Sequence, residues 1–144
     1  MTDLTGKTWM AIGETDDSEA FIESYEAAAA ITKGDPVYLS ADDKVSPAAA
    51  AQDCIGIAVE SQATVGKPVP VLTRGRVKVK AGAAITRGKA VQGADSSKRV
   101  LMLTDQAVSE GGSGNYTVYY NRKLGTALET TSAADDLLFI IVGK

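Results

Sequence analysis

The sequence predicts an all-β protein, folded as a compact β-barrel or β-sandwich of two similar halves with an extended N-terminal arm. The first observation is an internal repeat: most of residues 30–37 (Ala-Ile-Thr-Lys-Gly-Asp-Pro-Val) recurs 54 positions later (30 to 84) in residues 84–91 (Ala-Ile-Thr-Arg-Gly-Lys-Ala-Val). In the same order along the chain, residues 55–60 (Ile-Gly-Ile-Ala-Val-Glu) are matched by residues 124–129 (Leu-Gly-Thr-Ala-Leu-Glu). Two blocks repeated in order indicate a duplicated β unit. The third observation is a hydrophobic share of 44% with only 6% aromatics, which favours thin layers of small side chains.

The chain is expected to begin with an arm over residues 1–17, which is polar and rich in Gly, Thr and Asp. Its isolated large apolar residues are Trp9, Met10 and Ile12. One interpretation is a loose arm. The other makes these residues anchors that dock on a neighbouring subunit or partner, because large apolar side chains on an unstructured arm otherwise gain nothing.

Residues 18–144 are predicted to form a single β domain, with half one at about 28–80, half two at about 82–144 and an insertion at about 105–122. Residues 18–30 fit both helical and strand spacing, and we favour a strand because a strand-like segment also precedes the downstream repeat. Further strands are expected near residues 36–39, 45–47, 54–60, 69–80, 91–93, 100–103 and 137–142. The last of these is a continuous apolar run that corresponds to residues 69–72 and should be buried in the fold or at a subunit interface.

The most regular strand carries four cations, Arg74, Arg76, Lys78 and Lys80, which strict alternation places on one face. A solvated face or an edge protected against aggregation is the simplest interpretation. Contact with an acidic protein surface is the functional one. Nucleic-acid binding is disfavoured, because no aromatic residues interleave the cations and the net charge is −3.

The predicted insertion breaks the symmetry, since the spacing between matching blocks grows from 54 (30 to 84) to 69 (55 to 124). It contains the Gly-rich residues 111–115, followed by Tyr116, Tyr119 and Tyr120. A Gly/Ser tip beside an aromatic strand indicates a protruding hairpin or loop. These tyrosines are expected either in the core or at a protein interface.

No catalytic or metal site is predicted, and no cofactor. The chain has no His, its single Cys54 lies in an apolar strand, and the pairs Asp16-Asp17, Asp42-Asp43 and Asp135-Asp136 occur where turns are expected. There is no apolar signal-peptide region and no run of the roughly 20 apolar residues that span a membrane, so we expect a soluble, intracellular chain that is not an enzyme.

Residues 30–37, 55–58 and 69–79, with the core Arg74-Gly75-Arg76-Val77, resemble the small capsid decoration (cement) proteins of tailed bacteriophages, in particular a DUF2190-like group. Residues 124–129 resemble the late Gly-x-Ala-Leu element of that group. The resemblance covers roughly residues 28–144. The first 27 residues and the loop around residues 111–120 depart from the usual shorter chain.

The resemblance implies a compact β-barrel or β-sandwich that binds the outside of an assembled head, commonly as a homotrimer, and clamps neighbouring major capsid subunits. Such a protein is made in the host cytoplasm and resides on the outer capsid surface of the virion. It implies no direct contact with nucleic acid or membrane. The alternative from the residues is a β-structured host-surface or carbohydrate-binding accessory module of the virion. In both cases the interface candidates are those of the arm, the cationic strand and the insertion: Trp9, Met10, Ile12, Arg74, Arg76, Lys78, Lys80, Tyr116, Tyr119 and Tyr120.

Overall fold

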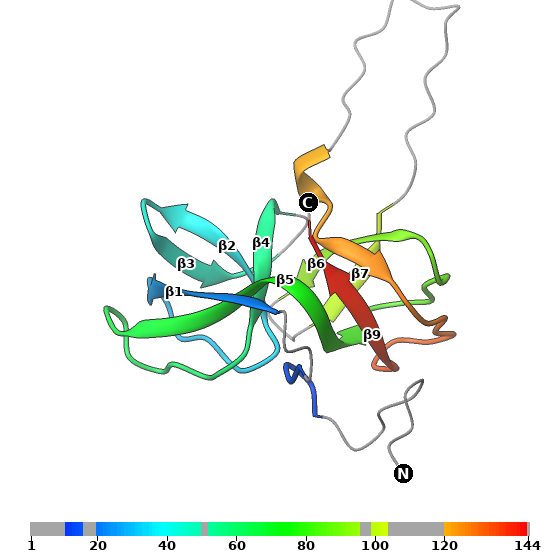
Figure 1. Cartoon of the computed structure of the whole chain (residues 1–144), viewed down its shortest axis with the longest axis horizontal. Helices are drawn as coiled ribbons and strands as arrows, with labels where there is room; N and C mark the ends of the chain where they lie inside the picture. The colour runs from blue at the N-terminus through cyan, green and yellow to red at the C-terminus, as the bar shows by residue number, and fades with distance from the viewer. Residues whose placement is uncertain (1–10, 16–19, 50–51, 96–98, 104–119, 144) are drawn as a thin grey trace, which may run out of the picture.

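The computed structural model describes residues 11–15, 20–49, 52–95, 99–103 and 120–143. These residues form nine β-strands and one short 3-10 helix, which confirms the all-β prediction (Figure 1). The strands are β1 (Phe21–Ala27), β2 (Pro36–Ala41), β3 (Lys44–Pro47), β4 (Cys54–Ala58), β5 (Pro68–Ala81), β6 (Ala90–Asp95), β7 (Arg99–Met102), β8 (Gly125–Ala127) and β9 (Leu137–Val142), and the helix is η1 (Tyr120–Arg122). The ambiguous segment at residues 18–30 is therefore a strand over β1, as favoured.

The strands close into two small barrels that share β5. In the first, the order β1-β3-β2-β4-β5 is closed by pairing between β1 and β5. In the second, the order β5-β7-β6-β8-β9 is closed by pairing between β5 and β9. Figure 1 shows one barrel on each side of the molecule, with β5 running from one into the other. Closure leaves few unpaired strand edges and confirms the predicted barrel.

The strand register reproduces the sequence repeat. Ser24 of β1 pairs with Pro70 of β5, and Lys78 of β5 pairs with Phe139 of β9. The offsets are again 54 (24 to 78) and 69 (70 to 139). The second part of β5 thus corresponds to β1, and β9 corresponds to the first part of β5, as predicted for the terminal apolar run. The passage from one half to the other lies within β5.

The first repeated block forms the same turn in each half. Gly34 and Gly88 have φ values of 94° and 84°, in the left-handed region that glycine adopts without steric cost. The N–H of Gly34 donates to the carbonyl of Ala58, and that of Gly88 donates to the carbonyl of Ala127, both at 2.8 Å. These glycines therefore shape a turn that leads into a strand.

The second repeated block carries a glycine where two strands approach closely. A Cβ on Gly56 would overlap the carbonyl oxygen of Leu72, and a Cβ on Gly125 would overlap that of Ile141. Gly56 and Gly125 are equivalent positions (56 to 125), and so are the two carbonyls (72 to 141). The recurring Gly-x-Ala is thus explained by packing between β4 and β5 and between β8 and β9.

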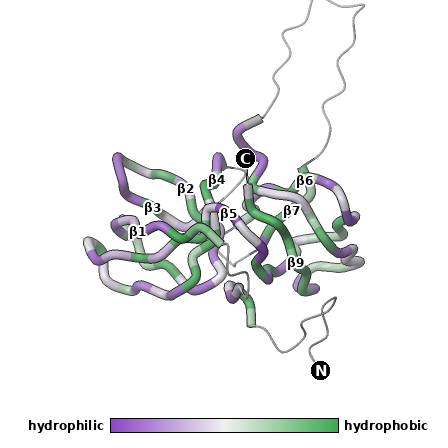
Figure 2. Tube along the Cα trace, viewed as in Figure 1, coloured by the Kyte–Doolittle hydropathy of each residue, from purple (hydrophilic) through white to green (hydrophobic). Residues whose placement is uncertain are grey.

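A shared core joins the two barrels. The larger cluster of buried side chains includes Cys54 and Leu72 from the first half together with Val91 and Leu138 from the second. A Cβ on Gly93 would collide with the Sγ of Cys54, so the absent side chain allows β6 to pack against the first barrel. Figure 2 shows the apolar residues concentrated along the strands, β9 in particular, and polar residues at the outer turns.

Two further expectations are also confirmed. Cys54 is fully buried at the start of β4, which fits its predicted position in an apolar strand. Asp43 and Asp135 have φ values of 56° and 69°, which fits their predicted positions in turns. The pair Asp16-Asp17 lies outside the described residues.

Candidate interaction surface

The outer face of the β5–β9 ladder combines cations with large apolar side chains. Residues directly opposite one another in a ladder project to the same side. The outward pairs, which we call the β5–β9 face, are Arg76–Ile141, Lys78–Phe139 and Lys80–Leu137. The intervening residues, such as Val77 and Ile140, belong to the core, so the face points away from it.

An aromatic ring lies beneath two of these cations. The guanidinium carbon of Arg76 is 5.1 Å and the Nζ of Lys78 is 5.8 Å from the ring centroid of Phe139. Phe139 is wholly buried, and Lys78 is only 7% exposed. Cations over an aromatic face are attracted by its quadrupole, and their apolar stems cover the ring.

The four cations of β5 differ in exposure and do not form a uniformly solvated row. Arg74 is exposed, Arg76 and Lys80 are half-buried, and Lys78 is buried. Strand alternation indicates the side to which a residue points, but it cannot indicate what lies beside that residue on the next strand. Here the neighbour of Lys78 is Phe139.

The same face exposes two large apolar side chains that sequence reasoning missed, Leu137 and Ile141, which are 46% and 48% exposed. Both belong to the terminal apolar run, which was expected to be buried in the fold or at a subunit interface; within this chain it is buried at alternate positions and at Phe139. The exposed Phe21 of β1 continues this surface, since it pairs with Arg74 beside the end of β9. The buried Phe139 separates Leu137 from Ile141 along β9, so these are individual exposed apolar positions on a cationic face and not one continuous apolar patch.

Part of the predicted arm lies on the body of the protein. The Gly13 N–H donates to the Lys78 carbonyl at 2.7 Å, and the Lys78 N–H donates to the Glu14 carbonyl at 3.3 Å. Ile12 is half-buried in this segment. Ile12 is thus not on a free arm, whereas Trp9 and Met10 lie outside the described residues.

The carboxylate of Glu14 holds the segment to the first repeat. Its Oε2 accepts from the Ala11 N–H at 3.0 Å, and its Oε1 is 3.2 Å from the Nζ of Lys33. These two contacts, the Ala11 N–H first, lower the pKa of Glu14 below its ordinary value of 4.5.

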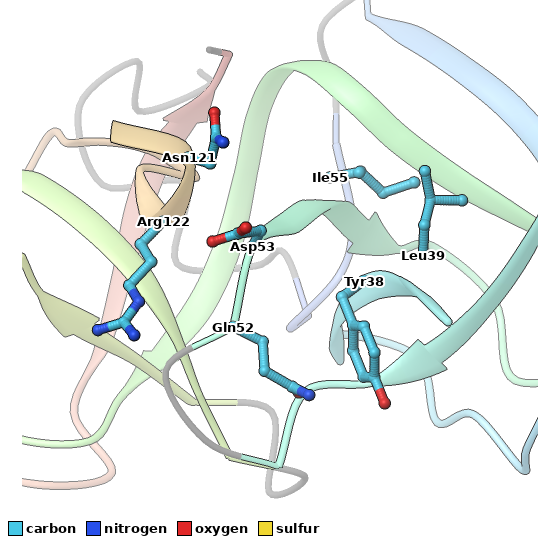
Figure 3. A pocket seen from close by; sticks show the side chains of 7 residues that line it. All are labelled: Tyr38, Leu39, Gln52, Asp53, Ile55, Asn121 and Arg122. Atoms are coloured by element: carbon cyan, nitrogen blue, oxygen red, sulfur yellow. The ribbon is translucent and has the colours of Figure 1, made fainter. Parts of the chain in front are cut away.

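A groove lies between the two barrels, with a volume of about 560 Å³ (Figure 3). Gln52 and Asp53 line it from the first half, and Asn121 and Arg122 of η1 line it from the second, at equivalent positions (52 to 121). Tyr38, Leu39 and Ile55 complete the lining. Among the described residues, the part of the predicted insertion that lines this groove is η1. Tyr120 begins η1, and Tyr116 and Tyr119 lie outside the described residues.

Within the described segments, no three His, Cys, Asp or Glu side chains gather in a way that could hold a metal ion. None of the helical structure seen there is long and apolar enough to cross a membrane.

The described part of the chain consists of two fused β-barrels with a mixed cationic and apolar outer face and belongs to the class of two-barrel, all-β proteins. A family model described as structural cement protein (E217 gp24/Pam3 gp6) matches residues 12–142, so the chain belongs to this family of phage structural proteins. Membership confirms the resemblance to capsid cement proteins. It makes the protein a stabilising structural component of the virion capsid.

Other comparisons bear on the fold alone. One similar solved structure is the N base of the head fibre gp8.5 of bacteriophage phi29, with a TM-score of 0.55 and 16% sequence identity. The match covers 85% of this chain and 93% of that chain, so the two-barrel architecture is shared over nearly its whole length. No curated protein sequence matches.

Proposed function

We propose that the protein binds the outer surface of the assembled phage head and stabilises the head by bridging neighbouring major capsid subunits. The observation that carries this proposal is the β5–β9 face, where Arg76 and Lys80 stand beside the exposed Leu137 and Ile141. A face of this composition suits a protein partner, because the apolar residues contribute binding energy and the cations contribute orientation.

The partner surface on the shell should be acidic around an apolar centre. Arg74 and the half-buried Arg76 and Lys80 supply positive charge on a chain whose net charge is −3. Arg74 adjoins the β5–β9 face, so this part of the surface carries three cations. An overall negative charge also disfavours direct contact with nucleic acid or an anionic membrane.

The stabilising mechanism is mass action. A protein that binds only the assembled shell lowers the free energy of that state, and each bound copy adds its contribution. The repeat gives the molecule two similar barrels joined through β5. We propose that, because the barrels lie side by side, one copy within a homotrimer can contact more than one capsid subunit.

Charge reversal on the β5–β9 face tests the binding site. Arg74→Glu combined with Lys80→Glu should weaken co-sedimentation with assembled heads at least about tenfold, because like charges then face the acidic shell. Lys67→Glu is the matched control, since Lys67 is also exposed but lies in the turn before β5. Equal binding by the double variant and the control would refute this assignment of the face.

A second candidate function is a host-surface or carbohydrate-binding module of the virion, and the groove favours it. Tyr38 with Gln52, Asp53 and Asn121 combines an aromatic residue with hydrogen-bonding groups in a concave site. Binding of the purified protein to host cells or glycans, without binding to heads, would support this function over the first.

A further inference from the structure

One edge of β1 is open over residues that the chain does not protect. β1 pairs with β5 from Phe21 to Glu26, but with β3 only at Glu26 and Ala27. Ser24 pairs with Pro70, whose carbonyl accepts from the Val59 N–H at 3.1 Å on the opposite side. Ser24 and Pro70 are therefore a pair without mutual hydrogen bonds, so the N–H and C=O of Ser24 point away from β5.

The equivalent edge in the second half is covered. Lys78 occupies the position of Ser24 (24 to 78), and its outward N–H and C=O bond to Glu14 and Gly13. The same place in the duplicated fold thus carries an extended segment in one half. In the other half, the described residues include no backbone hydrogen-bond partner for the outward N–H and C=O of Ser24.

The open edge also exposes apolar side chains. Phe21 is 55% exposed and Ile22 is 46% exposed. An exposed apolar strand edge is a template for pairing with another chain, and proteins protect it with charged side chains, Lys especially, or with Pro. β1 contains no Lys or Pro, and its charged residues are Glu23 and Glu26.

We propose that the open edge of β1 at Ile22–Ser24 binds residues 1–10 of a second copy of this chain by strand addition. These residues lead directly into the segment that covers the other half. Fully extended, they reach about 33–36 Å, which is sufficient to cross to a neighbouring copy. The inference is independent of shell binding and concerns how copies contact one another.

The sequence of residues 1–10 suits this edge. Residues 4–7 (Leu-Thr-Gly-Lys) contain an apolar, a small and a charged residue, as Ile12-Gly13-Glu14 do, with Thr5 as one additional residue. Glu14 is ion-paired with Lys33 of the first repeat. The open edge carries the exposed Glu23, which is opposite in charge to Lys7.

An arm that binds a different surface on the next copy makes a heterologous contact. Such contacts close into a ring when the rotation between copies permits. Three copies linked in this way would give the proposed homotrimer.

The test compares oligomeric mass by light scattering for the full chain, a deletion of residues 1–10, Ser24→Pro and the control Ser24→Ala. Ser24→Pro removes the outward N–H, while Ser24→Ala retains it. We expect an oligomer for the full chain and Ser24→Ala, and at least about tenfold weaker association for the deletion and Ser24→Pro. A monomeric full chain, or a deletion variant that associates as before, overturns the proposal.

Hydrogen exchange supplies a readout that does not depend on Ser24→Pro folding. The Ser24 amide should exchange slowly in the full chain at high concentration and rapidly in the deletion variant. Adding a peptide of residues 1–10 to the deletion variant should restore protection. Protection that persists without residues 1–10 would assign the edge to another occupant and overturn the proposal.

Discussion

Phe139 shows what a single residue adds to a strand pattern. It lies on the outer side of β9, yet it is wholly buried, with Arg76 and Lys78 over its ring. The sequence identifies β9 as apolar and β5 as cationic. It cannot show that these two strands are neighbours, because they lie far apart along the chain, so the burial of Lys78 could not be predicted.

Gly93 tests the contact between the barrels at the same scale. A Cβ at this position would also lie 3.1 Å from the Cβ of Pro36 and 3.3 Å from that of Ala48, besides overlapping Cys54. Gly93→Ala should lower the free energy of unfolding by about 1–3 kcal/mol through overpacking. Chemical denaturation measures the effect.

Cys54→Ala provides the control for that substitution, because it removes the sulfur that the new methyl group would meet. Alone it should cost about 1 kcal/mol as a small cavity. In the double variant the two costs should not add, since each change relieves the other. Full additivity would show that the two barrels do not meet at this point.

Glu14 makes docking of residues 11–15 dependent on pH. Because the folded-state pKa of Glu14 is lowered, its contribution is present above its ordinary pKa of 4.5 and is lost as the pH falls through the lowered value. The Gly13 amide resonance should therefore shift on acidification below pH 4.5. Glu14→Gln should abolish this transition, and an unchanged transition in that variant would assign it to another carboxylate.

At the scale of elements, β5 separates what the sequence predicts from what only the folded chain shows. The repeated blocks correctly predict two similar halves, because each contains a turn glycine and a close-approach glycine whose roles are local. They do not show that one strand serves both barrels. That property depends on the simultaneous pairing of β5 with β1 and β9.

Gly75 lies within β5 where one half passes into the other. Its φ of 130° is in a region that L-residues rarely adopt. Gly75→Ala should lower the free energy of unfolding by about 1–3 kcal/mol through backbone strain. Gly143→Ala, where an added Cβ meets nothing within 4 Å, should change it by less than about 0.5 kcal/mol. Equal thermal and denaturant midpoints for the two variants would show that the positive φ of residue 75 does not require glycine.

At the scale of the whole molecule, the fold and family could be predicted from the sequence, whereas the proposed interaction surface could be predicted only in part. The cations of β5 were found by alternation. Leu137, Ile141 and the groove residues were not, because exposure of an apolar strand and convergence of loop residues arise from tertiary packing. Trp9, Met10, Tyr116 and Tyr119 remain candidates.

The most direct test of head stabilisation is calorimetry of assembled heads that lack the protein, titrated with the purified full chain. The proposed function predicts that the melting temperature of the heads rises with protein concentration until the sites are filled, as mass action requires. The charge-reversed β5–β9 variant should need a higher concentration for the same rise. A melting temperature that stays constant at saturating protein would contradict the claim that this protein stabilises the phage head.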